Sequence, residues 1–111
     1  MFTTGTYTQT AKLNQYLRND VSCSSPEQLI MKVYDFAITN CQRHELIKTN
    51  EALQVLINAL NFETEEAKKI SSGLLKLYIY CQESMRKKKY AEVYKVLTEL
   101  RDTWKLALHN R

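Results

Sequence analysis

Residues 25–38 read S-P-E-Q-L-I-M-K-V-Y-D-F-A-I, and this stretch carries the clearest structural signal in the chain. Ser25 suits a helix N-cap, Pro26 suits the first helical position, and Gln28 can reach back to complete a capping box. The apolar residues that follow recur at helical spacing: Leu29, Ile30, Val33, Tyr34, Ala37, Ile38 and Cys41. The stretch therefore predicts an amphipathic helix that needs apolar partners.

Composition favours further helices as those partners. The chain has 111 residues, with only two glycines and one proline. This leaves too little turn chemistry for an all-β fold, and the length is typical of one domain. We expect an all-α fold, an antiparallel up-down four-helix bundle over residues 25–111. Residues 1–24 are polar and dotted with apolar side chains, and we expect them to form a flexible N-terminal arm on or near the bundle.

Three more helices follow from capping signals and apolar periodicity. Thr49 or Asn50 is predicted to cap the second helix, which ends at Asn61, and Thr64 is predicted to cap the third. The predicted core stripe of the third helix is Ala67, Ile70, Leu74, Leu77, Tyr78, Cys81 and Met85. The predicted stripe of the fourth helix is Tyr90, Val93, Leu97, Leu100, Trp104 and Ala107 or Leu108. Each helix thus has one face to bury.

The charges and cysteines indicate which cellular compartment we expect for the protein. The net charge is +4, with acidic and basic residues interspersed, and the run Arg86–Lys89 suits the negative end of the third helix. Three cysteines without paired spacing are typical of a reducing compartment, so we expect a cytoplasmic protein. The N-terminus has no pattern of a secretion signal, and no apolar run is long enough to span a membrane.

The sequence contains none of the patterns that usually carry catalysis. Neither His44 nor His109 follows a glutamate by three residues, as inward metal sites in bundles require. Cys41 and His44 have metal-like spacing but no second pair accompanies them. No phosphate loop or nucleophile motif is visible. We therefore expect no enzyme activity, catalytic residue, metal or cofactor.

The second and third helices carry more apolar residues than one face needs. If those faces point outward, the surplus forms an exposed strip suited to an amphipathic peptide laid between helices. The alternative is that these residues belong to the core or are covered by the N-terminal arm. The predicted groove residues are Ala52, Val55, Ala59, Leu75 and Ile79.

Several motifs, in order, resemble one known family. The run Tyr16–Val21 is followed by Ser25-Pro26-Glu27 with Leu29-Ile30, and then by Val33-Tyr34-Asp35 with Ala37-Ile38. Later come Leu56–Asn61, Leu74 with Leu77–Tyr80, and Leu100-Arg101-Asp102-Thr103-Trp104. In order and spacing these resemble the flagellin-specific export chaperones, the FliS family. The resemblance extends from about Tyr16 to Trp104.

This resemblance implies a function based on binding. Members of the family bind the disordered C-terminal segment of flagellin, prevent its premature polymerisation and present it to the membrane-embedded export gate. The expected partners are therefore flagellin and a flagellar export gate protein, with neither nucleic acid binding nor membrane insertion. The residues expected to dock the arm or the gate are Tyr7, Tyr16, Leu17 and Val21.

Two alternatives from other classes stay open at this point. The first is a small basic helical module that binds nucleic acid through Lys87, Lys88 and Lys89, in which case binding weakens steeply with salt. The second is a structural module that uses its apolar strip to self-associate as a homodimer.

Overall fold

The computed structural model describes residues 25–109, which contain four helices and no strand. The helices are α2 (Pro26–Gln42), α3 (Leu46–Asn58), α4 (Glu65–Arg86) and α5 (Tyr90–His109). Each packs mainly against two others: α2 contacts α3 and α5, and α4 contacts the same pair. The expectation of an all-helical fold is confirmed for this part of the chain.

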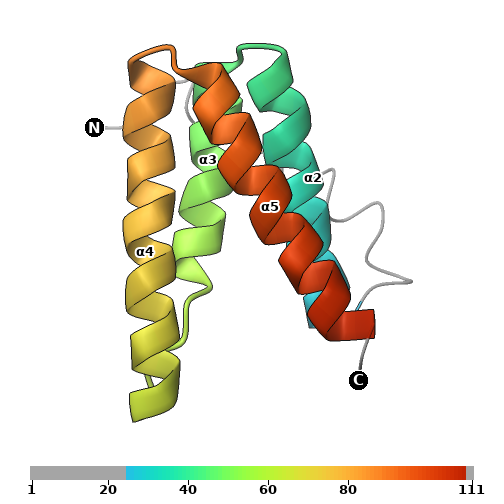
Figure 1. The fold of residues 1–111 in the computed structure, drawn as a ribbon, viewed down its shortest axis with the longest axis vertical. Helices are drawn as coiled ribbons and strands as arrows, with labels where there is room; N and C mark the ends of the chain where they lie inside the picture. Colours follow the sequence, from blue (N-terminus) through green and yellow to red (C-terminus); the bar gives the residue numbers. More distant parts are fainter. Residues whose placement is uncertain (1–24, 110–111) are drawn as a thin grey trace.

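The two ends of the helical assembly differ (Figure 1). At the end that we call the closed end, the connections at residues 43–45 and 87–89 lie near each other, and the helices are close together. At the other, the open end, α2 and α5 diverge from α3 and α4. The open end contains the first turns of α2 and α4 and the last turns of α3 and α5.

The start of α2 is as the sequence predicts. The Gln28 backbone N–H donates to Ser25 Oγ at 3.2 Å, and the Ser25 backbone N–H donates to Gln28 Oε1 at 2.9 Å. This reciprocal pair satisfies two backbone donors that the first turn leaves without a helical acceptor. The predicted cap of α4 is also present, because the Ala67 backbone N–H donates to Thr64 Oγ1 at 3.0 Å.

The predicted bounds of α3 were wrong at both ends. The helix begins at Leu46 after Glu45, so Thr49 lies inside it, fully buried, and its hydroxyl donates to the Glu45 carbonyl at 2.8 Å. A threonine hydroxyl can satisfy the carbonyl one turn back as readily as it caps a helix. Asn50 instead exchanges hydrogen bonds of 3.2 Å with Gln82 on α4. The last residue of α3 is Asn58, not Asn61.

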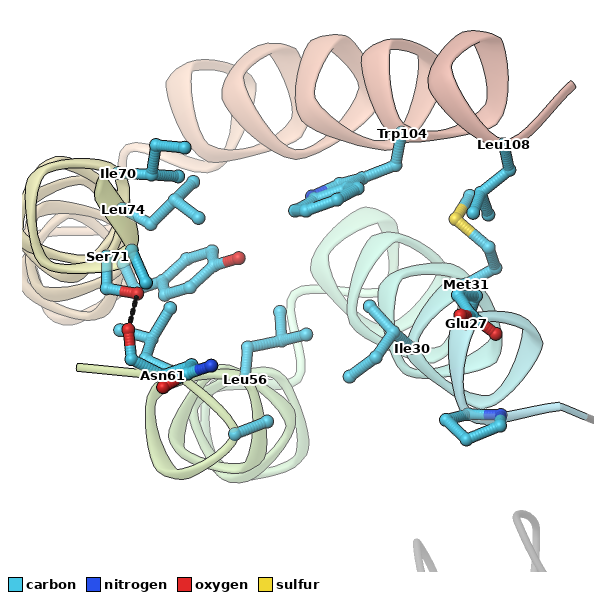
Figure 2. A pocket seen from close by; sticks show the side chains of 15 residues that line it. Glu27, Ile30, Met31, Leu56, Asn61, Ile70, Ser71, Leu74, Trp104 and Leu108 are labelled. Atoms are coloured by element: carbon cyan, nitrogen blue, oxygen red, sulfur yellow. Dashed lines mark hydrogen bonds between the residues drawn. The ribbon is translucent and has the colours of Figure 1, made fainter. Parts of the chain in front are cut away.

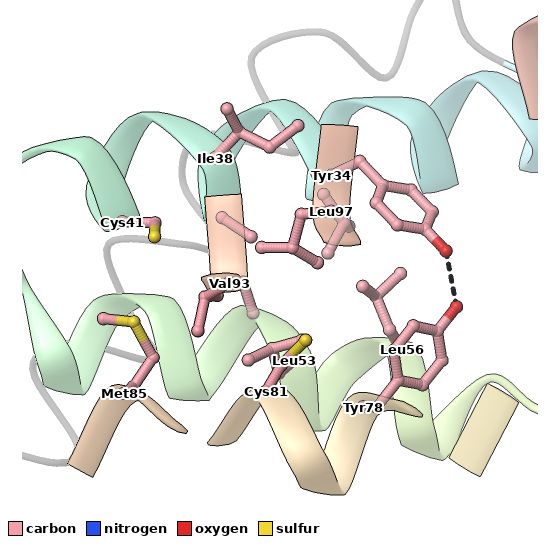
Figure 3. Packing of buried hydrophobic residues seen from close by; sticks show 13 residues of the cluster. Tyr34, Ile38, Cys41, Leu53, Leu56, Tyr78, Cys81, Met85, Val93 and Leu97 are labelled. Atoms are coloured by element: carbon pink, nitrogen blue, oxygen red, sulfur yellow. Dashed lines mark hydrogen bonds between the residues drawn. The ribbon is translucent and has the colours of Figure 1, made fainter. Parts of the chain in front are cut away.

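The core lies between the four helices and extends towards the closed end (Figure 3). It takes in five of the seven predicted stripe positions of α2, without Leu29 and Ile30, and the predicted stripe positions Val93 and Leu97 of α5. Four residues of the predicted α4 stripe lie outside it: Ala67 and Leu74 are half-buried, Ile70 is 63% exposed and Leu77 is 39% exposed. The buried hydrophobic residues are Val33, Tyr34, Ala37, Ile38, Cys41, Ala52, Leu53, Leu56, Tyr78, Cys81, Met85, Val93 and Leu97.

Candidate functional site: an apolar pocket at the open end

A pocket of about 360 Å³ occupies the open end, and all four helices contribute to its lining (Figure 2). Most of its walls are aliphatic or aromatic, and Glu27 is the only charged side chain among the lining residues that the structure describes. Its apolar lining residues are Pro26, Ile30, Met31, Leu56, Ala59, Leu60, Ala67, Ile70, Leu74, Trp104 and Leu108. The polar ones besides Glu27 are Asn61, Ser71 and Tyr78.

The early end of α3 creates the space. After Asn58 the chain leaves the helix and runs to Thr64 without regular structure, so the first turns of α4 have no neighbouring α3 turn. The connection is held in place by Ser71, whose hydroxyl donates to the Asn61 carbonyl at 2.6 Å. Ile70, on the side of α4 away from Asn61, lies at the pocket wall (Figure 2).

Three aromatic side chains form a polar network at the base of the pocket. The Tyr34 and Tyr78 hydroxyls lie 2.6 Å apart, and Trp104 Nε1–H donates to the Tyr34 hydroxyl at 3.1 Å. The tyrosine rings are tilted by 57° with their centroids 6.4 Å apart (Figure 3). The network joins α2, α4 and α5 directly beneath the apolar walls.

Both tyrosines stay protonated because they are buried. Burial raises the pKa of Tyr34, although its hydrogen bonds to Tyr78 and Trp104 act in the opposite direction. Burial also raises the pKa of Tyr78, and the neighbouring Tyr34 adds to the effect. Each hydroxyl is therefore available as a neutral donor at any physiological pH.

The structure does not gather the five predicted groove residues into one site. Ala59 lines the pocket, whereas Ala52 is fully buried in the core. Val55 and Leu75 are half-buried. Ile79 is 45% exposed and lines a different, more polar hollow with Lys76, Tyr80, Glu83, Ser84, Lys87 and Lys89. A client-binding role for these residues stays a prediction.

Apart from Ala59, the sequence analysis did not single out the residues that line the pocket as parts of a binding site. It placed Ile30, Ile70, Leu74 and Trp104 on core stripes. These residues do lie on apolar helix faces, but the pocket lies against them instead of a neighbouring helix. The only available signal was the mismatch between a short second helix and a long third one. The predicted arm residues Tyr7, Tyr16, Leu17 and Val21 lie outside the described residues.

Other groups in residues 25–109 do not form a second chemical site. Cys41 and Cys81 are both buried, and both are free thiols. The described residues contain no group of three or more His, Cys, Asp or Glu side chains placed to hold a metal ion. None of the described helices is both long enough and apolar enough to cross a membrane.

Residues 25–109 thus form an all-helical fold with an apolar pocket at one end. No protein-family model matches the chain. No curated protein and no solved structure matches it either. The pocket and its chemistry are therefore the basis for the function proposed next.

Proposed function

We propose that this chain is a chaperone that binds an amphipathic segment of a client polypeptide in the open-end pocket. The observation that carries the proposal is the pocket itself, an apolar concavity bounded by four helices and only partly covered. Ile70 lines it with 63% of its surface exposed. Apolar surface grouped in this way usually marks an interaction site, and a client helix laid against it would cover that surface.

The sequence resemblance supplies the client. We propose that the segment is the disordered C-terminal part of flagellin, that its capture prevents premature polymerisation, and that the complex is delivered in the cytoplasm to the flagellar export gate. The proposal includes an antiparallel up-down bundle with the N-terminal arm on or near it. Contacts between helices that follow one another in the chain are consistent with that topology.

Burial of client side chains is sufficient to drive such binding. Each fully buried Leu, Ile or Val contributes roughly 1.5–3 kcal/mol, whereas ordering a disordered segment costs roughly 2–5 kcal/mol. Several anchors therefore outweigh the ordering cost. Because Glu27 is the only charged side chain that residues 25–109 contribute to the lining, binding should depend little on salt.

Calorimetric titration with a synthetic flagellin C-terminal segment, at low and at moderate salt, tests the proposal. We expect tight binding with a negative heat-capacity change and little salt dependence. Steep weakening by salt in a titration with nucleic acid, together with no response to the peptide, would favour the basic-module alternative. A stable dimer without client, measured by light scattering, would favour self-association.

A matched pair of variants tests whether the client binds at the pocket. Ile70 and Leu106 are 63% and 64% exposed, so a glutamate is tolerated equally well at both positions, but only Ile70 lines the pocket. We expect Ile70→Glu to weaken peptide binding at least roughly tenfold, because a carboxylate must then be desolvated against the client. Leu106→Glu should leave the affinity unchanged. Equal affinities in the two folded variants would remove the pocket from the proposal.

A further inference from the structure

The hydrogen-bond network at the base of the pocket has one proton more than it has acceptors. It contains three donors, namely the Trp104 N–H and the hydroxyls of Tyr34 and Tyr78. Trp104 donates to Tyr34, and one tyrosine donates to the other. The structure gives the remaining hydroxyl proton no acceptor among residues 25–109. A buried donor without an acceptor is unfavourable unless a ligand or water satisfies it.

Either oxygen can be the donor in the Tyr34–Tyr78 hydrogen bond, but Tyr78 is the better placed of the two hydroxyls to carry the spare proton. Tyr34 is fully buried and is not part of the pocket lining, whereas Tyr78 is 2% exposed and lines the pocket. When Tyr34 accepts from Trp104 and donates to Tyr78, the three groups form one directional chain, and each hydrogen bond strengthens the next. The chain ends at the Tyr78 hydroxyl, which then offers its proton to the pocket.

The lining also decides which acceptor fits. It contains no Lys, Arg or His among the described residues, and its one charged group is the Glu27 carboxylate. A bound carboxylate would be buried without a cation, which is strongly unfavourable. A neutral acceptor, such as the carbonyl oxygen of an amide, carries no such penalty.

We propose that the pocket takes an apolar anchor of a polypeptide segment together with one neutral carbonyl oxygen, and that the Tyr78 hydroxyl donates to this oxygen. The inference deepens the proposed function and rests on it for the occupant being a polypeptide. A segment that leaves a helix suits the site well, because the last turn of a helix has carbonyls without intrahelical donors.

Three small probes of nearly equal shape test the acceptor preference: para-isobutylacetophenone, para-isobutylbenzoate and para-isobutylethylbenzene. Trp104 is the only tryptophan of the chain and lines the pocket, so its fluorescence reports occupancy. We expect the ketone to bind and the benzoate to bind at least roughly tenfold more weakly. The infrared carbonyl stretch of the ketone bound to the wild type should lie at lower frequency than that of the ketone bound to Tyr78→Phe, because only the wild type has the Tyr78 hydroxyl to donate.

Two variants, each lacking one hydroxyl of the Tyr34–Tyr78 pair, distinguish the hydroxyl that donates to the ketone from the hydroxyl that only positions it. Tyr78→Phe should weaken ketone binding roughly threefold to tenfold and leave hydrocarbon binding unchanged. Tyr34→Phe breaks the same internal hydrogen bond but keeps the Tyr78 proton, so it should retain the ketone preference. Circular dichroism and urea unfolding establish that both variants are folded.

The outcomes distinguish this inference from the proposed function. A carbonyl stretch at the same frequency in the wild type and in folded Tyr78→Phe, or equal ketone affinity in the two, overturns the role of Tyr78. A benzoate that binds as tightly as the ketone overturns the preference for a neutral acceptor. If ketone binding depends on Tyr78 but the flagellin peptide does not bind, the chemistry of the pocket stands and the flagellin client is rejected.

Discussion

The closed and open ends of the molecule are made by the same four helices but bury their apolar faces to different degrees. At the closed end Cys41 and Met85 are at most 1% exposed. At the open end Met31 and Leu108 are only half-buried and Ile70 is largely exposed. All of these side chains are apolar, so hydrophobicity does not explain the difference. What differs is how many helices are present at each level.

Helix length accounts for that difference. At 1.5 Å per residue, α3 with 13 residues is roughly 20 Å long, whereas α4 with 22 residues is roughly 33 Å long. Both helices have one terminus at the closed end, so α4 extends beyond α3 at the open end by two turns or more. All four helices line the pocket, but beyond the end of α3 the faces of α2, α4 and α5 have no fourth helix opposite them, which leaves the pocket open there.

The closed end is drawn together by two tight turns that contain no glycine. His44 and Lys88 both adopt left-handed backbone conformations, with φ of 59° and 61°. Such values are uncommon for residues other than glycine and need support from their surroundings. His44 stacks on Tyr90 with ring centroids 4.0 Å apart and planes 10° apart, which links the two turns.

Truncating one methionine at each end should give the largest difference in stability between the two ends. Met85→Ala is expected to lower the free energy of unfolding by roughly 2–5 kcal/mol, because its site at the closed end is fully packed. Met31→Ala at the pocket should lower it by less than about 1.5 kcal/mol. Urea unfolding measures both values. Equal losses would mean that the open end is as well packed as the closed end.

Alkaline pH should weaken the core by a smaller amount. Burial raises the pKa of Cys81 from 9.0 to about 12. Above pH 9.0 the unfolded chain releases this thiol proton while the folded chain keeps it, so rising pH favours unfolding until the folded pKa is reached. One pH unit above 9.0, Cys81 should account for a loss of stability on the order of 1 kcal/mol.

The Cys81→Ala variant isolates this contribution. When the pH is raised from about 8 to about 10 under reducing conditions, its stability should fall less than that of the wild type, by a difference on the order of 1 kcal/mol. Urea unfolding at the two pH values measures the difference. Parallel losses in the two proteins would show that the Cys81 thiol does not titrate differently in the folded and unfolded states.

Filling the pocket should change stability least and function most. Ala59→Leu places a larger side chain at the pocket wall, whereas Ala91→Leu makes the same change at an exposed position of the closed end. Both should alter the free energy of unfolding by no more than about 0.5 kcal/mol. Only Ala59→Leu should weaken binding of the ketone and the flagellin peptide. Equal weakening by Ala91→Leu would contradict the assignment of the site.

Local signals predicted the helices well where a cap was involved. Ser25 and Thr64 cap α2 and α4 as expected, because a capping hydrogen bond joins residues only three positions apart. The start of α3 was missed since Glu45 makes no capping hydrogen bond with its side chain, whereas Thr49 has the chemistry of a cap without that role. Capping rules recognise a helix start only where a cap is present.

The candidate site was less accessible to sequence reasoning. Ala52 was assigned to an exposed strip but is a core residue, since a small side chain on α3 suits close approach of a neighbouring helix. Ile70 was assigned to the core but lies at the pocket wall. Both residues have the apolar character that their faces require. Their exposure depends on which helix lies opposite, and periodicity carries no information about that.

The sequence by itself determined the helical class, the starts of α2 and α4, and the inward faces of α2 and α5, because these depend on residues within one or two turns of each other. Only the tertiary structure decided where the inward faces are covered. The hydrogen bonds from Trp104 through Tyr34 to Tyr78 join residues 44 to 70 positions apart, and the pocket also brings distant residues together. Their geometry follows from relative helix lengths and positions, which no local pattern encodes.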